Sequence, residues 1–333
     1  MTASLQDLIE AQDFNGLLRS VDGLVAARDW DGLIDLAERC EDAIERGKQL
    51  WPIAEHVDFR LALEAPAGYA ADVLAPGVGR FAPGPLTEVA ASTHTWAELA
   101  PHIEAPQVAA FVAQERVLRG EVLDGDERAH PQVLELPLHL TEWEPTYALA
   151  TYRRDLVEVM EPWDLKAPLT PVAATPTAGR ERVADDELES ALLDLVTPWV
   201  AESNGAAQVA IVEGDAATAI SALAFGELRM APLTTAEALQ RMAWAAASGG
   251  VHGRRRGAAL GRSVAWFVAS LATGTGWPVA AEDLGAALEH VRWFYWDEGG
   301  PEEGFVLRIA FEDLEHNIAT ALAATDVMED SEA

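Results

Sequence analysis

The residues best suited to bind a ligand are concentrated in one glycine- and arginine-rich segment, residues 248–262. Glycine lets a backbone approach a bound group closely, and arginine makes paired hydrogen bonds to phosphate or carboxylate. A helix that begins within the segment would add free N–H groups and the positive end of its dipole. The pattern predicts a site for an anionic, phosphorylated or carboxylated small molecule, with one histidine available as general acid or base. The candidate ligand-binding residues are Gly249, Gly250, His252, Arg254, Arg255, Arg256 and Arg262.

The same segment also has a purely structural interpretation. The chain holds 55 acidic residues, so internal ion pairs can use every arginine of the segment. Gly257 and Gly261 are four residues apart, which suits the close packing of a helix. Neither Gly-x-x-x-x-Gly-Lys-Ser/Thr nor Gly-x-Gly-x-x-Gly occurs, so the standard nucleotide-binding loops are unsupported. An anion site and a set of internal salt bridges therefore remain alternatives.

A second polar group, His94, Glu98 and His102, has a spacing of four residues. On one continuous helix these side chains would share a face and could hold a divalent metal. Thr95 is a helix-capping residue type, however, and Pro101 disfavours helix just before the second histidine. We therefore expect no metal site, and no motif in the chain indicates a cofactor or a catalytic residue.

Aromatic residues form a third group, because residues 293–296 read Trp-Phe-Tyr-Trp. Side chains alternate between the two faces of a strand, so these four cannot all point into one core. One face of the strand is therefore exposed or covered by another element, and Trp293, Tyr295 and Trp296 are candidate interface residues for another domain or subunit. Packing against a helix that contains Trp266 is the simpler alternative.

Composition excludes several classes of protein. Half of the residues (50%) are hydrophobic, which is typical of a globular chain and too many for a disordered one. No apolar run reaches the roughly 18 residues that cross a bilayer, and no signal peptide is visible. The net charge of −32 repels nucleic acid and anionic lipid, although the arginines leave a local nucleic-acid site as a disfavoured third hypothesis. With one cysteine, Cys40, we expect a cytoplasmic protein that binds a protein partner or itself, outside any membrane.

The first part of the chain has helical periodicity. Leu33, Ala37, Cys40 and Ile44 share one face of a predicted helix, and Thr95 with Glu98 forms a capping box. We expect a helical array or bundle over residues 1–131. In pattern alone, residues 14–120 resemble HEAT or armadillo arrays, although no repeat of fixed period aligns.

The period changes after residue 131. Leucines alternate with other residues over Leu134–Leu140, which predicts an edge strand, because Pro137 cannot donate to a ladder. Residues 146–153 are its expected partner. Prolines mark residues 162–179 as an extended linker. The predicted domains are therefore 1–131, 132–182 for the strand pair and linker, and 183–333.

The last predicted domain is helical with a β-hairpin. Thr234 and Glu237 form another capping box. Two aromatic and β-branched runs, 291–296 and 305–311, flank a Gly-Gly-Pro turn and predict the hairpin. Residues 314–324 are expected to form a final helix, and the short apolar run 207–212 fits a strand or a helix equally. The expected fold class is mainly α with minor β (α+β).

Two runs, Thr93–His102 and Ser248–Gly261, resemble an uncharacterised family of acidic, alanine- and arginine-rich actinobacterial proteins. The resemblance spans most of the chain and implies no activity. The sequence thus favours a non-enzymatic helical interaction or scaffold protein. The alternative is an enzyme or sensor that binds an anionic small molecule at residues 248–262.

Overall fold

The computed structural model describes residues 4–75, 77–154, 156–161, 164–173, 182–223, 227–299 and 303–328. Their contacts divide the chain into two compact units: unit 1 takes residues 1–134 and 150–159, and unit 2 takes residues 135–149 and 160–333. Residues 132–182, which the sequence analysis places in one segment, are therefore shared between the units. The predicted mainly α fold with a smaller β component is confirmed.

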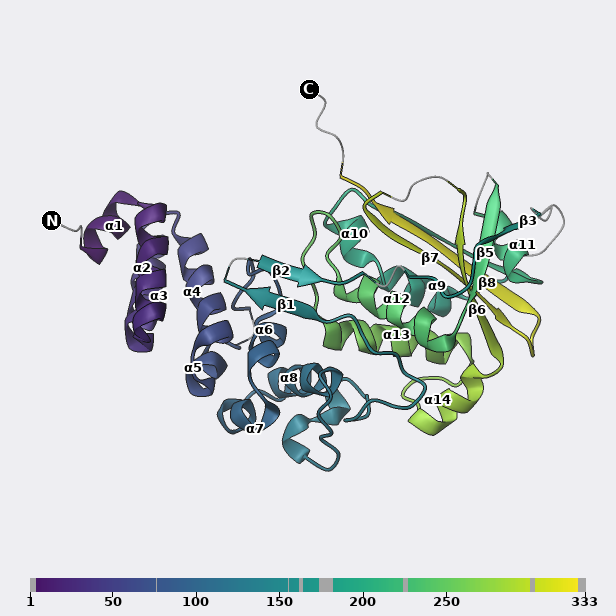
Figure 1. Cartoon of the computed structure of the whole chain (residues 1–333), viewed down its shortest axis with the longest axis horizontal. Helices are drawn as coiled ribbons and strands as arrows, with labels where there is room; N and C mark the ends of the chain where they lie inside the picture. Colours follow the sequence, from purple (N-terminus) through teal and green to yellow (C-terminus); the bar gives the residue numbers. More distant parts are fainter. Residues whose placement is uncertain are drawn as a thin grey trace, which may run out of the picture. The chain divides into compact units, whose positions relative to one another are not determined.

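Unit 1 is built from consecutive helices joined by short connections (Figure 1). Asp13 and Asp29 cap the second and third helices, since each carboxylate accepts a hydrogen bond from a backbone N–H of the first turn. The predicted buried face of the third helix is confirmed, because Leu33, Ala37 and Cys40 are all buried. The helices are α1 (Leu5–Ala11), α2 (Phe14–Ala27), α3 (Trp30–Glu45), α4 (Trp51–Glu64), α5 (Ala67–Asp72), α6 (Leu86–Thr93), α7 (Trp96–Leu99) and α8 (Pro106–Leu118), with short 3-10 turns η1 (Ala100–His102), η2 (Glu127–Ala129) and η3 (Pro131–Val133).

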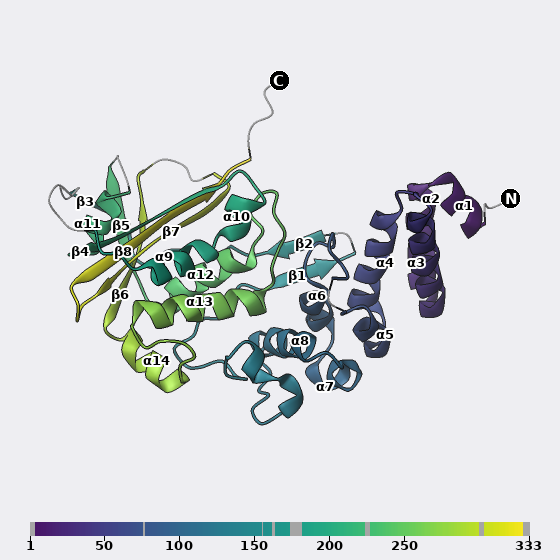
Figure 2. The same cartoon turned by 180° about the vertical axis from the view of Figure 1, so that it is seen from behind.

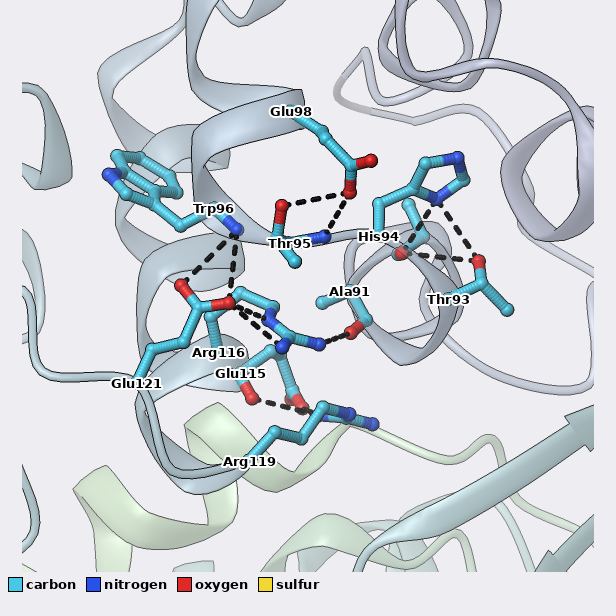
Figure 3. A network of polar contacts seen from close by, with 11 residues as sticks. Ala91, Thr93, His94, Thr95, Trp96, Glu98, Glu115, Arg116, Arg119 and Glu121 are labelled. Atoms are coloured by element: carbon cyan, nitrogen blue, oxygen red, sulfur yellow. Dashed lines mark hydrogen bonds and ion pairs between the residues drawn. The ribbon is translucent and has the colours of Figure 1, made fainter.

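A polar network holds α6, α7 and α8 together (Figure 3). Arg116 on α8 donates from Nε to Glu121 at 2.8 Å and from Nη1 to the carbonyl oxygen of Ala91 on α6 at 2.7 Å. Glu121 also accepts from the backbone N–H of Trp96, the first residue of α7. The arginine thus satisfies a carbonyl group near the end of one helix while its carboxylate partner satisfies an N–H group at the start of another.

A short hairpin, β1 (Ala150–Arg153) with β2 (Leu156–Val159), completes unit 1. The hydroxyl of Tyr152 donates to the buried carboxylate of Glu88 on α6 at 2.7 Å, and its ring contacts Phe59 on α4 edge-on. Arg154 makes a 2.5 Å ion pair with Asp22 on α2. The hairpin therefore belongs to the helical unit through side chains from three helices.

Unit 2 contains a six-stranded antiparallel sheet in the order β3-β5-β6-β7-β8-β4. The predicted hairpin is confirmed as β6 and β7, although residues 300 and 301 of its turn lie outside the described residues. The run 207–212, left open between strand and helix, is a strand. The strands are β3 (Thr170–Val172), β4 (Ala206–Glu213), β5 (Leu228–Leu233), β6 (Val291–Asp297), β7 (Phe305–Asp313) and β8 (Ile318–Asp326).

Three secondary-structure predictions are wrong. Residues 318–324, expected within a final helix over 314–324, belong to β8, because pairing with both β4 and β7 outweighs the helical propensity of the alanines. Residues 134–140 form no strand, and within their expected partner, residues 146–153, the strand β1 pairs with β2 instead. Their carbonyl groups at Pro137 and His139 accept hydrogen bonds from Arg262 instead of from a neighbouring strand.

Helices cover both faces of the sheet. Figures 1 and 2 show α9 (Asp186–Asp194), α12 (Thr235–Ala247) and α13 (Ala258–Ala272) along one face, and α11 (Ala216–Ser221) against the other. The short helix α10 (Thr197–Ala201) follows α9, and α14 (Ala281–Leu288) follows α13. The backbones of α12 and α13 approach closely at Gly261, where an added Cβ atom would lie 2.3 Å from the carbonyl oxygen of Ala243.

Gly261→Ala should therefore destabilise the protein. A methyl group there would force the two helices apart, and overpacking of this kind costs about 1–3 kcal/mol. Gly23→Ala is the matched control, because Gly23 also lies within a helix but has no atom within 4 Å of the added methyl. The control should be neutral or stabilising. Urea unfolding measures both variants, and equal stability of the two would contradict the close contact.

Candidate binding pocket

The predicted glycine- and arginine-rich site is a loop that connects α12 to α13, and its backbone is bound from inside the protein. The buried carboxylate of Asp326 accepts hydrogen bonds from the N–H of Val251 at 2.6 Å and from the hydroxyl of Ser203 at 2.9 Å. Gly250 has a φ of +69°, and an added Cβ would lie 2.1 Å from this carboxylate. Gly249 passes equally close to the backbone of Gly253. The glycines are explained by this close approach of the chain to itself.

The polar groups of the loop also have partners within unit 2. The N–H groups of His252 and Arg254 donate to Ser203 and Glu202, at 3.2 and 3.0 Å. Arg256 donates from Nη1 to the carbonyl oxygen of Asp194 at 3.0 Å, and its burial lowers the pKa of its guanidinium group. Arg255 is half-buried and engaged in further interactions. These contacts fit the structural alternative for residues 249–256.

Arg262 does not join the loop residues. It lies on α13 with its side chain fully buried, and it donates from Nε and Nη2 to the two oxygens of Glu144, both at 2.8 Å. Its Nη1 and Nη2 also donate to the carbonyl oxygens of Pro137 and His139, at 3.1 and 2.9 Å. One arginine therefore fixes the irregular segment 137–144 to α13.

The carboxylate of Glu144 is equally well satisfied. Besides Arg262, it accepts from the N–H of Thr141, the hydroxyl of Tyr147 and the indole N–H of Trp266, at 2.7–3.0 Å. Burial acts to raise the pKa of Glu144, but the hydrogen bonds and charge of Arg262, with the other donors, hold this pKa below its ordinary value. The pair is a fully hydrogen-bonded, charged anchor rather than an open site.

The candidate interface residues are buried within unit 2. Trp293, Tyr295 and Trp296 expose only 2%, 5% and 1% of their surface. Trp296 packs with the α11 side of the sheet, and Arg241 of α12 lies over the ring of Tyr295. The expectation that another subunit covers this face is wrong, because helices of the same chain cover both faces of β6.

His94 and Glu98, considered as metal ligands, have hydrogen-bond partners within unit 1. His94 ends α6, and its ring nitrogens contact the carbonyl oxygens of Ala90 and Ala65, at 3.1 and 2.8 Å. Glu98 accepts from Thr95 in the predicted capping box (Figure 3). No group of three metal-ligand side chains occurs in the part of the chain that the structure describes.

The site that the sequence analysis missed is a pocket of about 770 Å³ beside the Arg262–Glu144 anchor. Its walls are the segment 139–143 and helix α14. Trp143 forms one wall: its indole packs on Trp266, with ring centroids 4.8 Å apart, and rests on α14 at Gly285. An added Cβ at Gly285 would lie 2.6 Å from the indole nitrogen. The remaining lining residues are His139, Leu140, Thr141, Glu142, Thr235, Ala281, Glu282, Ala286, Leu288 and Glu289.

The pocket is negatively charged. Glu142, Glu282 and Glu289 line it, are exposed, and make no hydrogen bond or ion pair through their side chains within the described residues. No lysine or arginine is among the lining residues. Carboxylates gathered around a pocket attract a cation through their charge. Sequence alone gave no signal, because Glu142 is far in the chain from Glu282 and Glu289.

The fold and this pocket define an α+β protein with an acidic surface pocket in unit 2. A family model, the family of unknown function DUF6183, matches residues 15–327, and the chain belongs to this family. The predicted membership of an uncharacterised family is thus confirmed. No curated protein and no solved structure shows a significant match. None of the described helices is both long and apolar enough to cross a bilayer.

Glu144→Gln tests the anchor. The variant leaves the charge of Arg262 buried without a counterion, and breaking such a pair costs about 3–5 kcal/mol. Because folding lowers the pKa of Glu144, its stabilising effect is present above the pKa of the unfolded state and is lost as the pH falls through the folded value. Urea unfolding at pH 7 should therefore show that the variant is much less stable than the wild type. The difference in their free energies of unfolding should become smaller as the pH falls to 3.

Glu142→Gln is the control for this experiment, because Glu142 is two residues away but exposed. Its stability should remain within about 0.5 kcal/mol of the wild type. If Glu144→Gln were as stable as this control at pH 7, the proposed anchor would be wrong.

Proposed function

We propose that this protein is a non-enzymatic interaction protein that binds a basic segment of a partner protein. A lysine or arginine side chain of that segment enters the pocket between residues 139–143 and α14. The observation that carries the proposal is the combination of three exposed carboxylates with one aromatic wall in a single pocket.

The chemistry of the pocket favours a cation over the anionic ligand that residues 248–262 suggest. Each exposed ion pair contributes about 0.2–1 kcal/mol. The volume of about 770 Å³ lies within the usual range of ligand sites. Because the anchor fixes residues 137–144, this wall needs little ordering when a ligand binds, which favours affinity.

A protein partner is favoured over a free small amine because the carboxylates stand at the exposed rim. Exposed charges steer an approaching cationic surface and give specificity more than affinity. The predicted location in the cytoplasm belongs to this proposal. The HEAT-like interpretation of residues 14–120 and the actinobacterial source also stay predictions, and a helical array would suit an interaction role.

Isothermal titration calorimetry with a synthetic peptide, acetyl-Gly-Arg-Gly-Arg-Gly-amide, tests the pocket. The triple variant Glu142→Gln, Glu282→Gln, Glu289→Gln should raise the Kd at least about threefold, since three weak ion pairs are lost. The effect should shrink at high salt. A second titration with arginine amide tests a small cationic ligand. If arginine amide bound as tightly as the peptide, the pocket would be assigned to a small molecule instead.

Net charge needs its own control, because a chain with a net charge of −32 attracts any basic peptide. The triple variant Glu38→Gln, Asp42→Asn, Glu45→Gln removes the same charge from the exposed face of α3. It should bind the peptide nearly as the wild type does. Equal weakening by the two triple variants, or no binding by the wild type, would overturn the proposal.

A further inference from the structure

An exposed aromatic pair lies on unit 1, at the start of α4. The rings of Trp51 and Phe81 have centroids 4.5 Å apart, yet the two residues expose 41% and 61% of their surface. Large aromatic residues usually lose most of their surface on folding, and exposed apolar patches often mark binding surfaces. The N–H of Phe81 donates to Glu55 at 3.2 Å, so the turn that carries Phe81 is attached to α4.

Carboxylates continue the same face of α4. Glu55 and Asp58 follow Trp51 by four and seven residues, so all three side chains share one helical stripe. Most of the remaining residues of the helix are buried, such as Ile53, Val57 and Leu61. The stripe is therefore the open side of a central helix, and it combines apolar and acidic groups.

Asp58 is the unusual member of the stripe. It is half-buried, and its side chain makes no hydrogen bond or ion pair within the described residues. Burial, followed by the negative charges of Glu55 and of Glu41 on α3, raises the pKa of Asp58 to about 7. The arginine of the same helix, Arg60, is occupied by Asp22 and Glu64. A carboxylate in this position gains more from an added cation than an isolated surface carboxylate does.

We propose that Trp51, Phe81, Glu55 and Asp58 form a second docking surface, which binds an amphipathic segment of a partner protein through one apolar and one basic side chain. The apolar side chain covers the aromatic pair, and the lysine or arginine meets the two carboxylates. Charge complementarity selects this occupant: an anionic lipid surface is repelled by the carboxylates, and a second copy of this chain would bring the same acidic stripe. The surface is independent of the pocket in unit 2.

The linkage of binding to protonation gives the proposal a specific signature. A bound cation favours the charged form of Asp58, so it lowers the pKa of this group and displaces its proton. Affinity should therefore rise as the pH increases through about 7. In the absence of a partner, the raised folded-state pKa means that charging Asp58 destabilises the fold over the same pH range.

The test uses a synthetic 14-residue helix of lysine and leucine in amphipathic order, titrated into the full-length protein at pH 6 and pH 8. The wild type should bind more tightly at pH 8. Asp58→Asn should remove this pH dependence. Trp51→Ala and Phe81→Ser should each weaken binding severalfold at both pH values.

Matched controls separate the surface from general charge and exposure. Phe14→Ser alters another exposed aromatic residue of unit 1, and Glu38→Gln removes one carboxylate from α3. Both should bind as the wild type does. Thermal melting checks the fold, and Phe81→Ser keeps the test decisive if Trp51→Ala unfolds, because the Phe81 side chain is largely outside the core. Unchanged binding by Phe81→Ser and Asp58→Asn would overturn the proposal.

Discussion

The buried ion pair between Arg262 and Glu144 is the constraint on which the candidate pocket depends. Residues 137–144 form neither a helix nor a strand, so their backbone groups need other partners. Arg262 supplies donors to two of the carbonyl groups and to the carboxylate, and Glu144 in turn accepts from Thr141 within the same segment. A buried pair gains stability only when its remaining donors and acceptors are satisfied, and here they are. The segment is consequently a fixed wall, and Trp143 has a defined position against α14.

The same principle explains the loop that the sequence marks most strongly. Residues 249–256 combine the glycines, arginines and N–H groups of an anion site, and they do bind an anion: the carboxylates of Asp326 and Glu202 from the same chain. A loop pattern cannot tell a bound phosphate from an internal carboxylate, because both present oxygen acceptors to the same donors. A chain with 55 acidic residues supplies such a carboxylate itself. Unlike a separate ligand, this carboxylate loses no translational freedom when it binds the loop.

Sequence patterns predicted what depends on local order. Helical periodicity located the buried face of α3, and the capping boxes at Thr95 and Thr234 fixed two helix starts. The β6–β7 hairpin followed from its aromatic runs. β8 was missed because its alanines favour helix in isolation, and only pairing with β4 and β7 makes them a strand. The pocket and the α4 surface were missed because each joins residues that only tertiary packing brings together.

The two proposed surfaces share a physical cause. Internal partners consume many of the acidic residues, as Glu144, Glu202 and Asp326 show, and the remaining acids carry an excess of negative charge outward. An excess of negative charge attracts basic partners at long range but does not fix the position in which they bind. A defined binding position needs a fixed apolar group beside the charge. The chain provides one at each proposed surface: Trp143 in the pocket and Trp51 on α4. In both proposals, a tryptophan beside carboxylates is thus the feature that separates a docking surface from an acidic face that is merely solvated.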